Sequence, residues 1–391
     1  MRTIGVVTVG RSDFGIYRPV LEAIRQEPEL QLHLFVSGMH LSPQYGLTVE
    51  LIEAEGFAVH ERIEMLLSSD SPEGIAKSMG LGTAGFAQSF AHSRPDLLLV
   101  LGDRFEMHAA ALAALPFNIP VAHIHGGEVT EGAMDEALRH AITKLSHLHF
   151  TSTEEYARRV IQLGEEPWRV TVCGAPSLDN LKTVHLLDAA GMEAHFGLHI
   201  SVPPLLVTFH PVTLAYQQVE DQIKQLLLAL EASALPVIFT LPNADTGNSL
   251  IRRAIAAFVA GHSNAQAVEN LGTQGYFSLM SLAAAMVGNS SSGIIEATSF
   301  ELPVVNIGTR QRGRIHGSNV LDVGYNHAEI LDGIQRAVSS AMRQSLRGLQ
   351  NPYGDGRAAE RIVCRLCEVP LDEKLIVKRF HDLPSQDVWR V

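Results

Sequence analysis

The stretch LLLVLGDRFEMHAAALAALP, residues 97–116, joins a short apolar run to a segment of helical length. The run Leu97–Leu101 is rich in leucine and valine and ends at a glycine, as strands buried on both faces of a parallel sheet do. A strand followed directly by a helix is the repeating unit of α/β proteins. This stretch therefore predicts an α/β fold, with Asp103 and Arg104 at the end of a strand.

Similar apolar runs recur along the chain in two series, with segments of helical length between them. The first series comprises Ile4–Val9, Leu32–Ser37, Leu97–Leu101, Val121–His125, His149–Ser152 and Val170–Cys173, and the second Leu205–Phe209, Val237–Leu241, Ala267–Glu269, Met286–Gly288 and Val304–Ile307. Alternating strands and helices predict doubly wound sheets. Two series predict two Rossmann-like domains facing a cleft. We expect the first over residues 1–185, the second over 200–355, and a C-terminal helix and tail over 356–391.

The composition excludes several classes of protein. Of the 391 residues, 46% are hydrophobic and 18% charged, which fits a globular chain of two or three domains. The net charge of −12 argues against a nucleic-acid partner. No apolar run reaches the roughly 18 residues of a membrane helix. The three cysteines indicate a reducing compartment. We therefore expect a soluble, cytoplasmic protein that binds neither nucleic acid nor membranes.

Polar residues gather where the strands of the first series end, which is where ligands bind in open α/β sheets. Asp103 and Arg104 follow one run, His125 and Glu128 follow the next, and Asp135 lies early in the helical segment after it. A structural ion pair is the alternative for Asp103 and Arg104. The histidines lack the spacing of known metal motifs, so we expect no metal. The remaining interpretation is an acid–base cluster.

The other strand ends carry cations, hydroxyls and a histidine. Arg11 follows the first run and suits a phosphate ligand. The alternative is a solvent-exposed arginine without a ligand. His210, at the tip of a run in the second series, is a candidate general acid or base. Ser290–Ser291 begin a helical segment and predict an anion site, with simple capping as the alternative. Glu296 could accept two ribose hydroxyls, and Arg314 adds positive charge.

Several motifs occur together in order: GRSDFGIYRP, SGMHLSPQYG, GDRFE, HIHGGEVTEGAMDEALRHAITKLSH, FHPVT, NADTG, GNSSSGIIE and GTRQRGRIHGSN. Over most of its length the chain thereby resembles the hydrolysing UDP-N-acetylglucosamine 2-epimerases. The resemblance implies a fold of the glycosyltransferase-B type, no metal, no cofactor, and a homodimer or homotetramer. It also implies conversion of UDP-N-acetylglucosamine and water into N-acetylmannosamine and UDP, through elimination of UDP and hydration of a 2-acetamidoglucal.

The resemblance also assigns roles to individual residues. Those implied for acid–base chemistry are Asp103, Asp135 and His210. Those implied for UDP and its sugar are Arg11, Ser290, Ser291, Arg314, Glu296, Tyr276, Phe277, Asn243 and Arg104, and we expect His40 in a sugar-facing loop.

One departure leaves the catalytic assignment open. Many relatives carry HIEGGE where this chain has HIHGGE, so His125 stands in place of a glutamate. Either His125 transfers the proton or Glu128 does, unless the change marks another sugar. The nearest alternative is the same reaction on UDP-N,N′-diacetylbacillosamine, on the route to legionaminic acid. A non-hydrolysing epimerase, a glycosyltransferase and an inactive UDP-sugar sensor are the other readings.

Overall fold

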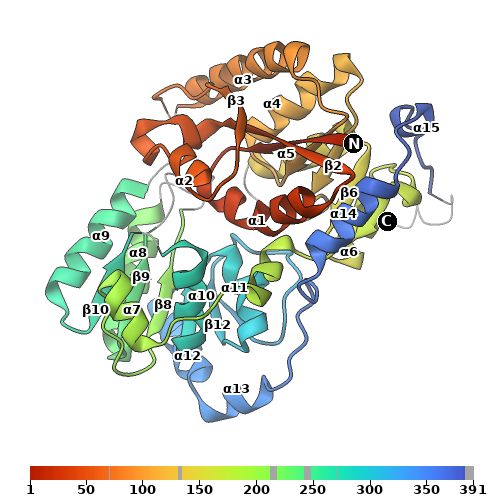
Figure 1. Cartoon of the computed structure of the whole chain (residues 1–391). Coiled ribbons are helices and arrows are strands. Elements are labelled where there is room, and N and C mark those ends of the chain that lie inside the picture. The colour runs from red at the N-terminus through yellow and green to blue at the C-terminus, as the bar shows by residue number, and fades with distance from the viewer. Residues whose placement is uncertain (70, 131–133, 212–217, 242–247, 270, 384–391) are drawn as a thin grey trace. The chain divides into compact units, whose positions relative to one another are not determined.

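The computed structural model describes residues 1–69, 71–130, 134–211, 218–241, 248–269 and 271–383. The chain forms two compact units (Figure 1). Unit 1 consists of Met1–Glu128, Met134–Asp179 and Tyr353–Val391, and unit 2 of Val129–Ala133 and Asn180–Pro352. Between the two predicted domains, 1–185 and 200–355, lies helix α7 (Ala189–Phe196), which packs against α10 (Gly272–Leu282) within unit 2.

Unit 1 is built on a parallel sheet of seven strands in the order β3-β2-β1-β4-β5-β6-β7. The strands are β1 (Arg2–Thr8), β2 (Leu30–Ser37), β3 (Val59–Ile63), β4 (Leu97–Leu101), β5 (Val121–Ile124), β6 (Leu148–Thr151) and β7 (Val170–Val172). Every residue of the central strands β4, β5 and β6 is buried. Burial on both faces explains the uninterrupted apolar sequence of β4, LLLVL, whereas β5 and β6 each also bury a histidine.

Helices cover both faces of this sheet. They are α1 (Arg11–Gln26), α2 (Val49–Ala54), α3 (Pro72–His92), α4 (Phe105–Ala114), α5 (Met134–Leu145), α6 (Glu154–Gln162), α14 (Ala358–Glu368) and α15 (Glu373–Ile376). Helix α4 packs between α3 and α5, whereas α1 packs against α14 (Figure 1). The late helix α14 thus completes the layer begun by the first helix of the chain.

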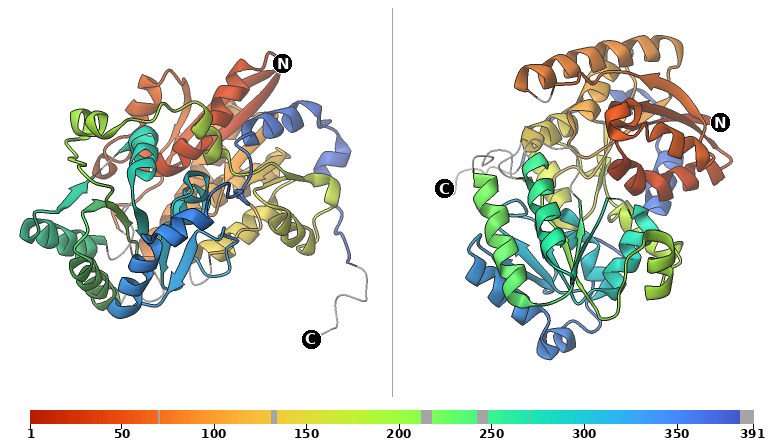
Figure 2. Two further views of the ribbon diagram at one scale, coloured as in Figure 1. Left: turned by 90° about the horizontal axis from the view of Figure 1, so that it is seen from below. Right: turned by 90° about the vertical axis from the view of Figure 1, so that its left-hand side faces the viewer.

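Unit 2 is also built on a parallel sheet, with six strands in the order β10-β9-β8-β11-β12-β13. The strands are β8 (Leu205–Thr208), β9 (Val237–Thr240), β10 (Ala265–Val268), β11 (Ala285–Gly288), β12 (Val304–Ile307) and β13 (Val320–Val323). Besides α7 and α10, its helices are α8 (Val219–Ser233), α9 (Asn248–Gly261), α11 (Ser291–Ile295), α12 (His327–Ala337) and α13 (Ser340–Ser345). Helix α8 packs against both α9 and α12, and the long helices α8 and α9 lie side by side (Figure 2).

The predicted fold class, two doubly wound α/β sheets, is confirmed, and eleven of the strands lie within a few residues of their predicted positions. The sequence analysis missed β3 and β13, which are edge strands. In the part of the chain that the structure describes, no helix has the length and apolarity to cross a bilayer.

Each sheet has one point where the strand order reverses, and ligands of open α/β sheets bind there. In unit 1 this point lies between β1 and β4, and in unit 2 between β8 and β11. Arg11 and Asp103 follow β1 and β4, while His210 and Ser290 follow β8 and β11. The topology therefore places the predicted residues at the position where each sheet favours a ligand.

A buried arginine attaches the C-terminal segment to unit 1. Arg169 is 1% exposed, and its guanidinium donates hydrogen bonds to the carbonyls of Leu375 (2.8 Å), Lys374 (2.9 Å), Val377 (3.0 Å) and His147 (3.2 Å). Because guanidinium donors lie in a rigid plane, these bonds fix the path of the chain after α14.

Candidate functional site

Two aspartates and an arginine lie together at the end of β4. Asp103 forms an ion pair with Arg139, which is 3% exposed. Burial, together with the negative charge of Asp103, raises the pKa of Asp135 to about 6. A carboxyl group that titrates near neutrality can both accept and donate a proton under physiological conditions. The predicted juxtaposition of Asp103 and Asp135 is therefore present in unit 1.

Arg139 is a residue of the candidate site to which the sequence analysis gave no role. Its guanidinium also donates a 2.8 Å hydrogen bond to the carbonyl of His125, so it joins the ends of β4 and β5. The signal was in the sequence: Asp135 and Arg139 are four residues apart on α5 and share one helix face.

His125 and Glu128 form a second acid–base pair at the end of β5. Nδ1 of His125 lies 2.5 Å from Oε1 of Glu128, and Ser152 donates a 2.8 Å hydrogen bond to the same oxygen. Because a carboxylate oxygen accepts, Nδ1 of His125 is the donor in this contact. The contact with Glu128 therefore fixes the orientation of the His125 ring.

The turn between these two residues is unusually tight. His125 has a φ of +66°, which is uncommon for a residue with a side chain, and Gly127 has a φ of +77°. A Cβ atom on Gly127 would lie 2.4 Å from the carbonyl oxygen of Tyr156, so only glycine fits there. The turn holds the ring of His125 over Glu128 at some conformational cost, as is common at functional sites.

The remaining predicted residues of unit 1 differ in accessibility. Arg11 is exposed at the start of α1, and the side chain of Arg104 is 30% exposed beside α4. His40 is fully buried, and its ring nitrogens lie 3.0 Å and 2.7 Å from the hydroxyls of Thr8 and Thr48. Burial lowers the pKa of His40 to about 4. Its neutral ring thus supports the loop from inside, and its predicted contact with the sugar stays a prediction.

In unit 2, Asn289 organises the ends of β8 and β11. The backbone N–H of His210 donates to Oδ1 of Asn289 (2.7 Å), and Nδ2 of Asn289 donates back to the carbonyl of His210 (2.8 Å). Arg310 and Gln311 each donate a 2.9 Å hydrogen bond to the carbonyl of Asn289. This residue ties the His210 loop to the arginine-rich loop, and the sequence analysis did not single it out.

His210 is neutral in this arrangement. Burial, together with the charge of Arg310, lowers the pKa of its ring to about 3. Its Nδ1 is buried and has no hydrogen-bond partner among the described residues. A neutral imidazole offers one nitrogen as a hydrogen-bond donor and one as an acceptor, and the acid–base role of His210 stays a prediction.

Hydroxyl groups surround the start of α11. Ser290 caps this helix by accepting a hydrogen bond from the N–H of Ser292. Burial raises the pKa of Tyr276, and its hydrogen bonds to Ser292, Thr208 and Ser290 oppose that effect. The negative charge of Glu296, which is 7% exposed, raises the pKa of Tyr276 as well. Tyr276, Ser290 and Glu296 are thus gathered at one end of the sheet.

Three other predicted residues of unit 2 have different outcomes. Arg314 is half-buried, and its Nε donates a 2.8 Å hydrogen bond to the carbonyl of Val129. Phe277 is 4% exposed and packs edge-on against Phe300, so its ring lies in the interior. Ser291 is the first residue of α11. Asn243 lies outside the described residues.

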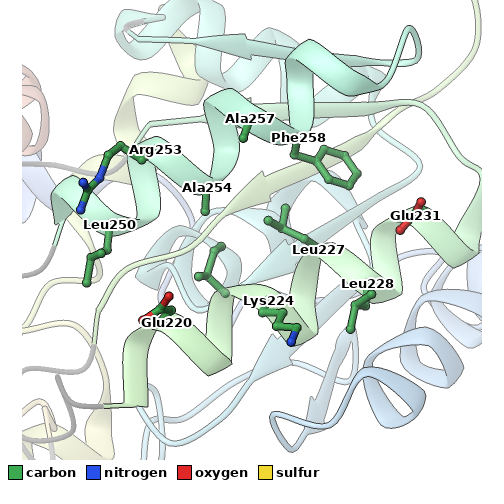
Figure 3. Close-up of a pocket in the computed structure, with 11 residues that line it drawn as sticks. Glu220, Lys224, Leu227, Leu228, Glu231, Leu250, Arg253, Ala254, Ala257 and Phe258 are labelled. Atoms are coloured by element: carbon green, nitrogen blue, oxygen red, sulfur yellow. The ribbon is translucent and has the colours of Figure 1, made fainter.

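A separate cavity of about 670 Å³ lies between α8 and α9 (Figure 3). It is lined by Leu227, Leu228, Leu250 and Phe258, with Glu220 and Arg253 among its charged residues. None of the lining residues is a predicted site residue, so this groove is distinct from the candidate site. Among the residues whose positions are described, no three His, Cys, Asp or Glu side chains are grouped as a metal site would require.

The fold and the site define a two-domain α/β protein of the glycosyltransferase-B type, equipped with acid–base residues at the strand ends of unit 1. A family model described as UDP-N-acetylglucosamine 2-epimerase matches residues 22–366. The chain therefore belongs to the UDP-N-acetylglucosamine 2-epimerase family, and the resemblance predicted from its motifs is confirmed.

Individual relatives cover almost the whole chain. It is 37% identical to the UDP-N,N'-diacetylbacillosamine 2-epimerase (hydrolyzing) of Legionella pneumophila, over 97% of this chain and 99% of the relative. It is 36% identical to polysialic acid biosynthesis protein P7 of Escherichia coli, over 98% of each. The solved structure of UDP-GlcNAc 2-epimerase from Neisseria meningitidis bound to UDP-GlcNAc shares the fold, with a TM-score of 0.81 at 20% identity over 94% of this chain and 100% of that one.

Proposed function

We propose that this protein is a hydrolysing 2-epimerase that converts UDP-N-acetylglucosamine and water into N-acetylmannosamine and UDP. The observation that carries the proposal is the paired arrangement in unit 1, Asp103 with Asp135 and His125 with Glu128, in a chain of this family. The reaction needs a base and an acid at C2 of the sugar, and these two pairs supply candidates for both.

The proposed reaction has two balanced steps. A base takes the C2 proton while the C1–O bond breaks, which releases UDP and leaves a 2-acetamidoglucal. Water then adds its hydroxyl to C1, and an acid protonates C2 from the opposite face. We propose that His125 exchanges its proton through Nε2 while Glu128 orients the ring. Asp103, Asp135 and His210 are the other proton-transfer groups.

For the nucleotide, we propose Arg314, Arg11 and the Ser290–Ser291 hydroxyls as diphosphate ligands, with Glu296 on the ribose and Tyr276 near the base. A diphosphate leaving group gains stability from positioned cations and hydroxyl donors. Asn243 remains a predicted contact. His40 and Phe277, whose side chains are buried, likewise remain predicted contacts.

The specific observation that favours a second substrate is the Legionella relative, which is named for UDP-N,N'-diacetylbacillosamine. The same acid–base groups would act on it, since only O4 and O6 of the sugar differ. Measuring UDP release from both nucleotide sugars, without an acceptor, tests the function and ranks the substrates. Release from neither would contradict the proposal and favour a transferase or a sensor.

We further propose a cytoplasmic location and a homodimer or homotetramer. The cytoplasmic proposal is supported by the cysteines, because Cys173, Cys364 and Cys367 are all free thiols. Sedimentation of the purified protein tests the oligomeric state.

The shifted pKa of Asp135 gives a testable pH dependence. Because the folded-state pKa, about 6, is above the ordinary 3.8, the protonated group favours the folded state at low pH. That contribution is lost as the pH rises through about 6. Carbon-13 NMR of labelled aspartates should show one carboxyl titrating near pH 6, absent from Asp135→Asn and moved to lower pH in Asp103→Asn. A titration that Asp103→Asn leaves unchanged would contradict the proposed coupling.

The phosphate role of Arg314 predicts a loss of nucleotide affinity. Arg314→Ala should weaken UDP binding by about 10-fold or more, which corresponds to a lost charge-assisted contact of about 1.4 kcal/mol or more. Calorimetric titration with UDP measures the effect. Arg336→Ala, at an arginine 61% exposed on α12, is the matched control and should bind UDP normally. Equal affinities for both variants would refute the phosphate role.

A further inference from the structure

Two buried carboxyl groups lie beneath Arg104 in unit 1, and the proposed proton transfers use neither of them. Asp13 is 3% exposed and Glu106 is 0% exposed. Nε of Arg104 lies 3.4 Å from Oε2 of Glu106. Apart from this contact, the carboxylate oxygens of Glu106 have no partner in hydrogen-bonding geometry among the described residues. A buried carboxyl group held by one long ion pair gains little for the cost of its burial, so fold stability alone does not explain Glu106.

Asp13 belongs to the same cluster. Its Oδ2 accepts hydrogen bonds from the hydroxyl of Thr8 (3.0 Å) and the N–H of Val9 (2.8 Å), which fix the carboxyl in place. Burial raises the pKa of Asp13, and the positive charge of Arg104 partly opposes this. Burial also raises the pKa of Glu106, and the charge of Asp13 adds to that effect. Both carboxyl groups therefore act on the same guanidinium.

The backbone closes tightly around these carboxyl groups. A Cβ atom on Gly10 would lie 3.2 Å from Oδ1 of Asp13, and one on Gly38 would lie 3.1 Å from Oε1 of Glu106. Sδ of Met39 lies 3.8 Å from Nη2 of Arg104. Glu106 and the buried end of Arg104 consequently have little freedom to reorient.

Arg104 also interacts electrostatically with Asp135. Its charge lowers the pKa of Asp135, opposing the upward shift that burial and Asp103 cause. Arg104 therefore lies within electrostatic reach of the proton-transfer residues, and its side chain remains 30% exposed. Glu106 pairs with it directly, and Asp13 and Asp135 also interact with its charge, so this positive charge is partly compensated. A compensated guanidinium suits a neutral acceptor oxygen better than a diphosphate, which needs excess positive charge.

We infer that Glu106 is a positioning residue, which with Asp13 holds Arg104 so that it donates to a neutral oxygen of the sugar, a hydroxyl or the acetamido carbonyl. The inference rests on the proposed function. It separates the arginines by role: Arg104 recognises the sugar, whereas Arg314 and Arg11 serve the diphosphate. A guanidinium group that is already held in place loses less conformational entropy on binding than a mobile one. Glu106 therefore contributes affinity without touching the substrate.

The test compares Glu106→Gln, Arg104→Lys and wild type. Glutamine keeps the size of Glu106 but removes its charge. For both variants we expect a KM for the UDP-sugar about 10-fold higher, with kcat changed by less than about 3-fold and with unchanged affinity for UDP. Combining the two substitutions should add little, because both remove one interaction. Glu22→Gln, at a partly exposed glutamate on α1, is the charge-matched control and should behave as wild type.

Three results would overturn the inference. In the first, Glu106→Gln lowers thermal stability but leaves KM unchanged, which makes Glu106 merely structural. In the second, UDP affinity falls as much as UDP-sugar affinity, which places Arg104 on the diphosphate. In the third, the effects of the two substitutions add fully. A wild-type protein that releases no UDP would contradict the proposed function separately. The inference would then be tested by calorimetric affinities for UDP-sugar and UDP.

Discussion

Asp103→Asn should lower turnover by about 10²-fold or more, the lower end of what a positioned proton-transfer group contributes. Asparagine keeps the shape of the side chain but cannot exchange a proton at neutral pH. The substitution also removes the negative charge of Asp103. The pKa of Asp135 should therefore fall, and Arg139 loses its ion pair with Asp103. The rate of UDP release measures the effect.

The control for this prediction is Asp332→Asn, at an aspartate 67% exposed on α12, which should keep normal turnover. Because Arg139 is buried and loses its ion-pair partner, the thermal stability of Asp103→Asn must be measured alongside. Near-normal turnover in a folded Asp103→Asn variant would remove this residue from the mechanism.

Arg169→Ala should lower the free energy of unfolding of unit 1 by about 3 kcal/mol or more. The change leaves four backbone carbonyls without their guanidinium donor, each costing on the order of 1 kcal/mol. It also removes the ion pair with Glu166 (2.9 Å) and the stacking of the guanidinium on Trp168 (4.3 Å to the ring centre). Urea denaturation measures the loss.

Hydrogen exchange gives this prediction a local readout. The amides of α15, whose carbonyls Arg169 binds, should lose protection before the rest of unit 1. Arg62→Ala removes an arginine whose ion pair with Glu53 is exposed, and it should cost at most about 1 kcal/mol. Unchanged protection of α15 in Arg169→Ala would show that other contacts hold this segment.

The sequence predicted the sheets well where burial is complete and poorly at their edges. Strands such as β4 are buried on both faces, so an uninterrupted apolar run reveals them. Strand β3, VHERI, has three consecutive polar residues because it lies at the edge of its sheet and is partly exposed. Strand β13, VLDV, is the corresponding edge of unit 2 and was missed for the same reason.

The candidate site shows a similar limit. The sequence predicted that Asp103, His125 and His210 follow the ends of strands, and the structure has them there, because topology alone brings such residues to the carboxyl edge of a parallel sheet. The buried position of His40 depends on Thr8 and Thr48, which approach it from separate segments. The role of Glu106 depends on Asp13, which is far away in the sequence. Such contacts arise from tertiary packing, and no local pattern encodes them.

The most direct test of the central claim is proton NMR of the wild-type protein with UDP-N-acetylglucosamine in D₂O. The proposed mechanism exchanges the C2 proton with solvent, so the products should be free UDP and N-acetylmannosamine carrying deuterium at C2. If the same result appears only with UDP-N,N'-diacetylbacillosamine, the mechanism stands and the second substrate is the correct one. Release of UDP with the C2 proton retained in the sugar would contradict the elimination, and with it the roles of the acid–base pairs in unit 1.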